Sequence, residues 1–202
     1  MPHRTTMRRR ETDGGARFLT FSCDHRQPLL AREGVRDLFS ACLKAARERH
    51  GFDLFAWVVM PEHVHLLIRP IPETTVETIL RSLKIAVARR VLSMAPTLLP
   101  FQPEIAPTAD GSCTAAGRRP RFWQPGGGFD RNVRDEFEFF RTVHYIHHNP
   151  VERGLATRPE EYPWSSARWW TAVREGSTQD LPGSCVECDP FPGKGWWRTG
   201  PP

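Results

Sequence analysis

Two histidines stand one residue apart in an apolar segment, and they are the first side chains in the sequence that could do chemistry. His63 and His65 flank Val64 within MPEHVHLLI, residues 60–68. Side chains alternate between the two faces of a β-strand, so both imidazoles would point to the same side. Imidazole nitrogens bind divalent metal ions. The pair therefore indicates a metal site, and the alternative is two chance histidines on a solvated strand face.

A tyrosine and an asparagine in YIHHNP, residues 145–150, could complete such a site. Tyr145 and Asn149 are four residues apart and would share one face of a helix. The chain has twelve phenylalanines but only two tyrosines, Tyr145 and Tyr162, which favours a role for the hydroxyl group. An ordinary half-buried helix tyrosine is the alternative. Tyr162 follows two acidic residues and precedes a proline, so it is interpreted as structural.

Together these side chains suggest phosphoryl chemistry. A cation held by two imidazoles and an amide oxygen would bind a phosphate oxygen and polarise the P–O bond. A neutral phenol, with a pKa of about 10, is a weak nucleophile unless such an ion offsets the charge that develops. Attack by the phenol would give a phosphotyrosine, which conserves the bond energy for rejoining.

The segments that must position these residues predict an α+β fold. Strands are expected at residues 16–23, 52–60 and 63–70, and helices at residues 32–50, 74–92 and 135–150, with a further short helix within 158–170. The second and third strands are separated only by Pro61 and Glu62, which predicts an antiparallel hairpin. Order resumes over residues 122–133, where a further strand is expected and three glycines allow a sharp turn or a close approach. The mixed order of elements favours a mostly antiparallel sheet.

The helix ends carry their own signals. Thr74 with Glu77 and Asp135 with Glu138 have the spacing of capping boxes. Pro150 is expected to end the last long helix, because the residue before a proline is pushed out of the α region.

Composition and periodicity divide the chain into three parts. Residues 1–15 are predicted to form a flexible basic N-terminus, residues 16–171 a single domain, and residues 172–202 a loosely packed tail rich in glycine and proline. Residues 95–121 contain five prolines and little periodicity, so they are interpreted as a flexible insertion within the domain.

The composition of the 202 residues also narrows the class of protein. The formal net charge of +5 favours an anionic partner, most commonly nucleic acid. No segment has the roughly 18 apolar residues of a membrane span. Five scattered cysteines disfavour a disulfide framework and favour a cytoplasmic protein. Cys185 and Cys188 form one CxxC pair, but a structural zinc site would need two further ligands.

Basic side chains gather on the helix predicted over residues 74–92 and around the insertion, and aromatic residues follow. Such groups could track a phosphate backbone and stack on unpaired bases. The alternatives are a solvated face for the charges and a core position for the tryptophan. The candidate DNA contacts are Arg81, Lys84, Arg89, Arg90, Arg121 and Trp123, with Arg118, Arg119 and Phe129 close by.

Five motifs in sequence order resemble the REP-associated tyrosine transposases. They are WVVMPEHVHLLI, SLK, FWQ…FDRNVRDEFE, YIHHNPVERGL and YPWSS, and the similarity extends from about residue 17 to residue 170. The first contains a motif of two histidines flanking a bulky hydrophobic residue (HUH), which is typical of the wider IS200/IS605-like family of single-tyrosine transposases.

The resemblance implies a ferredoxin-like or RRM-like antiparallel sheet with helices packed on it. It also implies cleavage and rejoining of single-stranded DNA, often beside a hairpin, with Mg²⁺ or Mn²⁺ as the cofactor. His63, His65 and Asn149 would be the metal ligands, and Tyr145 the nucleophile that forms a 5′-phosphotyrosine. This branch of the family is expected to act as a monomer rather than a dimer.

The sequence departs from the family at several points, which leaves the DNA target and present-day mobilisation open. Glu62 stands where the family often has asparagine, and PGGG replaces a more aromatic stretch. Two other functions are considered. A metal-dependent hydrolase that activates water would keep its activity in Tyr145→Phe, and a domesticated, non-catalytic binder of DNA hairpins would be unaffected by a chelator.

Overall fold

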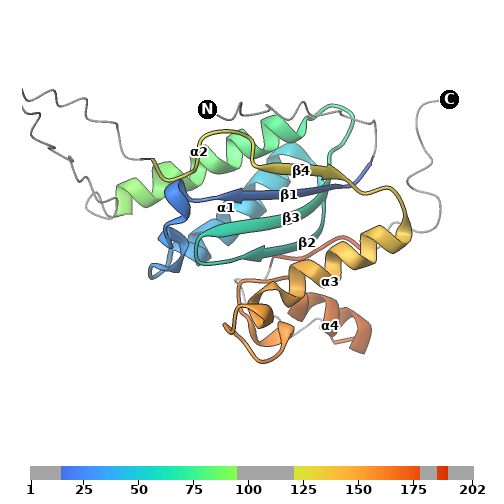
Figure 1. Ribbon diagram of the computed structural model, residues 1–202. Coiled ribbons are helices and arrows are strands. Elements are labelled where there is room, and N and C mark those ends of the chain that lie inside the picture. Colours follow the sequence, from blue (N-terminus) through green and yellow to red (C-terminus); the bar gives the residue numbers. More distant parts are fainter. Residues whose placement is uncertain (1–14, 95–120, 178–185, 191–202) are drawn as a thin grey trace, which may run out of the picture.

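A four-stranded antiparallel sheet with helices on both faces organises the molecule (Figure 1). The computed structural model describes residues 15–94, 121–177 and 186–190. Its elements are β1 (Arg17–Ser22), α1 (Val35–His50), β2 (Asp53–Val59), β3 (His63–Arg69), α2 (Val76–Met94), β4 (Phe129–Asn132), α3 (Glu136–Glu152) and α4 (Ala167–Glu175). The strand order β2-β3-β1-β4 and the β-α-β-β-α-β succession are those of a ferredoxin-like fold. The expected α+β fold is confirmed.

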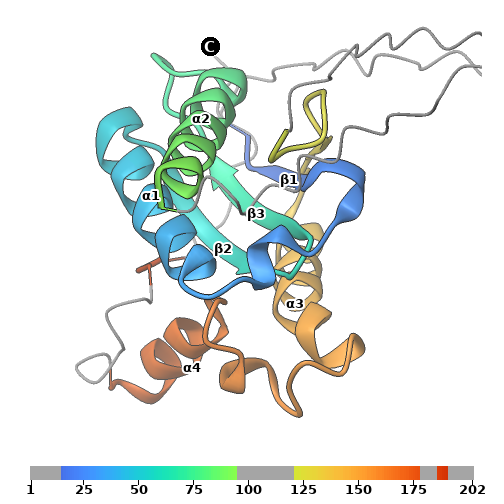
Figure 2. The same cartoon turned by 90° about the vertical axis from the view of Figure 1, so that its left-hand side faces the viewer.

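The two faces of the sheet are covered by different helices. Helices α1 and α2 lie on one face and α3 on the other, while α4 lies beside β2 (Figure 2). Val64, Leu66 and Ile68 belong to a core cluster formed with α1 and α2, whereas Leu67 belongs to a second cluster that includes Phe139 of α3. A strand buried on both faces has apolar residues on both, so β3 reads as an almost continuous apolar run.

The hairpin predicted around Pro61 and Glu62 is present. Strands β2 and β3 pair antiparallel, and the turn is closed by a hydrogen bond of 2.8 Å from the backbone N–H of Met60 to the carbonyl of His63. Strand β3 also pairs with β1, which places Thr20 directly opposite His65. The histidines therefore lie on a central strand that is fixed on both sides by backbone hydrogen bonds.

Two of the expected helix signals are corrected by the structure. The backbone N–H of Thr78 donates to Oγ1 of Thr75, so Thr75 caps α2, while the hydroxyl of Thr74 donates to the carbonyl of His50. Either threonine could have served from sequence alone, because both precede the apolar stripe, and the packing of α2 against the end of α1 selects the second.

Asp135 caps α3 as expected, accepting from the N–H of Glu138 at 2.7 Å. The Glu138 carboxylate accepts from the N–H of Arg134 at 2.8 Å, so the reciprocal half of the predicted box is displaced by one residue.

Helix α3 does not end at Pro150, as expected from the sequence, but continues to Glu152. A proline removes one backbone donor, and here the helix extends only two residues beyond it. The neighbouring carbonyls still find donors: the N–H of Arg153 donates to Asn149, and that of Leu155 donates to Pro150. Residue 149 therefore remains within the helix that carries Tyr145.

The glycines before β4 bring that strand against β1. Gly128 has φ of 75°, and a β-carbon at this position would overlap the carbonyl oxygen of Thr20. The next residue, Phe129, pairs with Thr20 in the β1–β4 register. Only glycine meets both requirements, so the PGGG sequence permits a close approach of two backbones next to the histidine pair.

The free edge of β2 is covered by two segments that follow it far along the chain. The N–H of Val59 donates to the carbonyl of Trp164, and the N–H of Ser166 donates to the carbonyl of Trp57, both at 2.9 Å. Farther along the strand, the N–H of Asp189 donates to the carbonyl of Leu54 at 2.7 Å.

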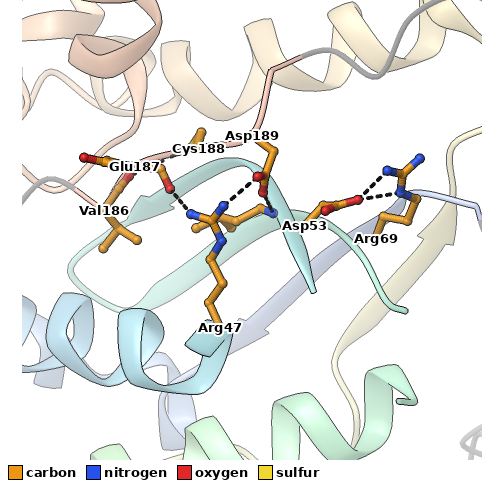
Figure 3. A network of polar contacts seen from close by, with 8 residues as sticks. Arg47, Asp53, Arg69, Val186, Glu187, Cys188 and Asp189 are labelled. Carbon is orange, nitrogen blue, oxygen red and sulfur yellow. Dashed lines mark hydrogen bonds and ion pairs between the residues drawn. The ribbon is translucent and has the colours of Figure 1, made fainter. Parts of the chain in front are cut away.

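Residues 186–190 are held at this edge by a polar network (Figure 3). Oδ2 of Asp189 accepts from the N–H of Leu54 at 2.7 Å, and Oδ1 forms an ion pair with Arg47 at 2.6 Å. Arg47 also donates to the carbonyl of Glu187, and the indole N–H of Trp57 donates to the carbonyl of Val186.

These contacts correct the expectation of a loosely packed tail after residue 171. That boundary falls inside α4, and residues 186–190 are part of the packed domain. The predicted flexible N-terminus and insertion lie outside the described residues, except at their last residues, as does Cys185 of the CxxC pair. None of the described helices is both long and apolar enough to cross a membrane.

Candidate active site

The two histidines of β3 face each other beneath α3. Their Nε2 atoms are 2.9 Å apart, and their rings are nearly perpendicular, with centroids separated by 4.6 Å. Both side chains are buried. The shared face expected from strand alternation is therefore present, and the alternative of two histidines on a solvated face is excluded.

Each imidazole is also in contact with a polar side chain through its Nδ1 atom. Nδ1 of His63 lies 3.1 Å from Oε1 of Glu62, and Nδ1 of His65 lies 2.7 Å from the hydroxyl of Thr20. Partners of this kind orient metal-binding imidazoles and increase the basicity of the ligating nitrogen. Both Nε2 atoms are therefore directed toward a common point.

Burial keeps both imidazoles neutral at neutral pH. It lowers the pKa of His65 to about 3, and the neighbouring His63 acts in the same direction. It also lowers the pKa of His63, against the opposing effect of the Glu62 carboxylate. The neutral imidazole is the form that could bind a metal ion.

The spacing of the two nitrogens fits adjacent ligands of an octahedral ion. With ligand distances of about 2.1 Å, two such ligands lie about 3.0 Å apart, whereas tetrahedral ligands would lie about 3.4 Å apart. The separation of 2.9 Å is close to the first value. Within residues 15–94, 121–177 and 186–190, no group of three or more His, Cys, Asp and Glu side chains could hold a metal ion. A metal ion at this position would therefore need further ligands of another kind, such as an amide, water or phosphate.

Tyr145 lies beside this pair with its side chain partly open to solvent. Its ring centroid is 5.4 Å from that of His65 and 5.8 Å from that of Phe18, and 42% of the residue is exposed. Phe18, a member of the second core cluster, stacks on His65 with ring centroids 5.6 Å apart. The hydroxyl-bearing residue that the sequence singled out is thus next to the histidines and accessible to a large substrate.

Asn149 lies one turn beyond Tyr145 on α3, because the helix continues through this position. Its side chain is buried. Tyr162, in contrast, donates its hydroxyl to the carbonyl of Val59 and accepts from Arg36. It holds the end of β2 in place, in agreement with the structural role predicted for it.

The candidate DNA contacts are not gathered around this site. Trp123 is buried against Phe21 and Phe39, and its indole N–H donates to the carbonyl of Lys84. It is a core residue and not a platform for bases, because its ring fills the space between the sheet and the helices above it. Phe129, by contrast, is 43% exposed and contacts Phe18.

The basic residues of α2 belong to the opposite face of the sheet from Tyr145. Arg81 and Arg89 line an open cavity of about 470 Å³ together with Arg49. Lys84 donates to the carbonyl of Gly126, and Arg90 lies against the sulfur of Cys42. Among the predicted contacts after the insertion, Arg121 is exposed, while the arginines at 118 and 119 lie outside the described residues.

Sequence reasoning left Glu62 without a role and missed Thr20, Arg26 and Arg153. Thr20 reaches His65 through strand pairing, and the two arginines reach Glu62 from segments distant in the chain. No local pattern signals such partners. The only available sign was the acid itself, standing directly before the first histidine of the motif.

The chain is similar to several known proteins. Residues 18–101 match the family described as "Transposase IS200 like". The REP-associated tyrosine transposase of Escherichia coli K12 is 27% identical over 159 residues, which cover 79% of this chain and 80% of that protein. A putative REP-associated tyrosine transposase of Haemophilus influenzae is 24% identical over 166 residues, covering 79% and 83% of the two chains.

A solved structure shares the fold. It is that of a REP-associated tyrosine transposase bound to a REP hairpin, with a TM-score of 0.61, 21% identity, and coverage of 92% of this chain and 93% of that one. Over the residues that carry the first three strands and the paired histidines, the chain is thus similar to IS200-like transposases. Its curated relatives are, more narrowly, REP-associated tyrosine transposases.

Proposed function

We propose that this protein is a metal-dependent endonuclease and strand transferase for single-stranded DNA. It cleaves and rejoins DNA beside a hairpin through a 5′-phosphotyrosine at Tyr145. The observation that supports this most directly is the position of the Tyr145 ring, 5.4 Å from His65, whose Nε2 faces that of His63. The relative that shares the fold was solved with a REP hairpin, which is why a hairpin is the proposed landmark.

The residues have separate roles in this reaction. His63, His65 and the amide oxygen of Asn149 would hold Mg²⁺ or Mn²⁺, which when bound polarises the scissile phosphate. The Tyr145 oxygen forms a bond to phosphorus, and the bond from phosphorus to the 3′ oxygen breaks, leaving a free 3′-OH. Rejoining reverses these changes when a 3′-OH attacks the phosphotyrosine and the phenol leaves.

Charged and aromatic residues around the site suit a single strand. Arg26 and Arg153 line a cavity of about 450 Å³ next to Glu62, and both are at least half exposed. They offer positive charge to the phosphates on one side of His63. Phe129, exposed on the other side of Phe18, offers a surface on which an unpaired base can stack. We expect the protein to work as a monomer in the cytoplasm.

The test uses an oligonucleotide that carries a hairpin and flanking single strands, labelled at either end. A 5′-phosphotyrosine retains the downstream fragment, so a 3′ label should become attached to the protein and survive denaturing electrophoresis. A 5′ label should appear only on a shortened free strand. Both products should require Mg²⁺ or Mn²⁺.

Tyr145→Phe should lower adduct formation by at least about 1,000-fold, because no other group at this position can form the intermediate. Tyr162→Phe is the matched control and should retain the adduct, since that hydroxyl is bound to the Val59 carbonyl. Cleavage that persists in Tyr145→Phe would instead support a hydrolase that activates water. Hairpin binding without cleavage, unaffected by a chelator, would support a non-catalytic binder.

A further inference from the structure

Glu62 is a buried carboxylate that contacts three cationic or polar partners through one oxygen. Its Oε1 lies 3.1 Å from Nδ1 of His63, 3.0 Å from Nη1 of Arg153 and 3.6 Å from Nη2 of Arg26. The side chain is only 9% exposed. A buried carboxylate is costly unless it is paired, and here Arg153 and Arg26 supply the pairing.

We propose that Glu62 is a positioning residue, which fixes the His63 tautomer so that the Nε2 lone pair faces the shared site. An ionised carboxylate can only accept hydrogen bonds, so the Nδ1 atom that lies against it must carry the proton. Nε2 of His63 is then left as an acceptor or a metal ligand. This inference rests on the proposed function, because the orientation of the His63 Nε2 lone pair concerns the metal site proposed there.

Two guanidinium groups hold this carboxylate in place. Arg153 and Arg26 both pair with Oε1 of Glu62, which favours the ionised form. Arg153 follows α3 directly, and its N–H donates to the carbonyl of Asn149. Glu62 therefore also ties the histidine strand to the helix that carries Tyr145.

Arg26 reaches Glu62 from a strained stretch of backbone. His25 and Arg26 have φ of 52° and 54°, and among the described residues they are the only non-glycine residues with positive φ. Such conformations are strained for residues other than glycine, and such strain gathers at functional sites. The turn that carries Glu62 is tied to the same stretch, because the N–H of Cys23 donates to the carbonyl of Glu62 at 2.9 Å.

His65 contacts a hydroxyl group rather than a carboxylate, and this difference sets the direction of the hydrogen bond between the two imidazoles. The hydroxyl of Thr20 can donate or accept, so it does not impose a tautomer on His65. With Nε2 of His63 as an acceptor, the contact of 2.9 Å between the two Nε2 atoms requires a proton on Nε2 of His65. The metal-free chain of hydrogen bonds then runs from Thr20 through His65 and His63 to Glu62. For Nε2 of His65 to bind an ion, its proton would move to Nδ1 of the same ring, where the Thr20 hydroxyl can accept it.

The experiment reads the tautomers directly, in metal-free protein at neutral pH, from the ¹⁵N shifts and couplings of the histidine side chains. His63 should be protonated on Nδ1 and His65 on Nε2. Glu62→Ala should leave His63 as a mixture of tautomers or shift it to the other one. Glu62→Gln should give a smaller change, because the amide oxygen can still accept. Glu161→Gln, at an exposed acid paired with Arg158, is the control and should leave both rings unchanged.

A second measurement follows Mn²⁺ binding without DNA, by calorimetry or electron paramagnetic resonance. Glu62→Ala should weaken binding by about 10- to 100-fold, and Glu62→Gln by less. An Nε2-protonated His63 in the wild type, or a Glu62→Ala variant with an unchanged tautomer and unchanged affinity, would overturn the proposal. If the wild-type tautomers are as expected but no Mn²⁺ binds, the metal site of the proposed function fails while the positioning by Glu62 stands.

Discussion

His63 and His65 can be identified from sequence because strand alternation and spacing are local properties. Tyr145 can be identified because an unusual residue stands at helical spacing from Asn149. The residues that contact them cannot be identified in this way. Thr20 meets His65 only because β1 pairs with β3 in one particular register, and Arg153 meets Glu62 only because α3 crosses the sheet at that point. A chemical motif can therefore be identified from the sequence, whereas the residues that orient its side chains are brought to it only by tertiary contacts.

His147 shows the same limit and supports a prediction about pH. It is buried on α3, and its Nε2 lies 2.8 Å from the hydroxyl of Ser166, which also bonds the backbone of Trp57. Burial lowers the pKa of His147 to about 3, with a further contribution from His148 and His144. Its neutral form thus stabilises the fold fully above the unfolded-state pKa of about 6.5 and loses that effect as the pH falls toward 3.

We expect the free energy of unfolding of the wild type to fall more between pH 7 and pH 4 than that of His147→Gln. The glutamine does not titrate and can still bond Ser166, so the difference between the two pH dependences should be roughly 1–3 kcal/mol. Urea denaturation at the two pH values measures it. Parallel pH dependences in the two proteins would show that His147 is not held neutral.

At the scale of elements, periodicity and turn chemistry identified all the long helices and the hairpin, while the ends were less certain. Thr75 caps α2 in place of Thr74, and α3 passes through Pro150. Both errors have the same origin, because a cap or a proline costs about 1–3 kcal/mol and packing can offset that amount. The β1–β4 pairing was equally hidden, since β4 has only four residues and little apolar pattern.

The junction of β1 and β4 should be intolerant of a side chain at Gly128. We expect Gly128→Ala to lower the free energy of unfolding by about 2 kcal/mol or more, for two reasons. The methyl group would overlap the Thr20 carbonyl, and alanine is strained at the positive φ of this position. Denaturant unfolding measures this change. Gly126→Ala is the matched control in the same loop, where a β-carbon meets no atom within 4 Å, and it should cost less. Equal losses in the two variants would mean that backbone strain alone is responsible.

At the scale of the whole molecule, the main difference from expectation is the place of residues 186–190. A segment rich in glycine and proline gives no periodic signal, so its binding to β2 could not be inferred from sequence. The open edge of a sheet is a hazard for aggregation, and proteins commonly cover it. Here the cover is made by backbone hydrogen bonds and by Asp189, which satisfies both the N–H of Leu54 and the guanidinium of Arg47.

Asp189→Ala should lower the free energy of unfolding by about 1–3 kcal/mol, because it leaves the part-buried N–H of Leu54 without its side-chain acceptor and removes the ion pair with Arg47. Thermal or urea unfolding checks this. Glu187→Ala is the control, since Glu187 is exposed and only its backbone carbonyl contacts Arg47. A loss as large in Glu187→Ala as in Asp189→Ala would show that the segment is held by something other than the Asp189 carboxylate.

This arrangement has a consequence for biosynthesis. Leu54 and Asp189 are 135 residues apart, so β2 must be translated long before the residues that close its edge. During that interval the nascent domain can assemble its helices and hairpin, but it presents an unpaired strand to neighbouring chains. Closing so long a loop is also entropically slow. Slower translation of the C-terminal segment should therefore lengthen the time for which this edge of β2 is open to other chains.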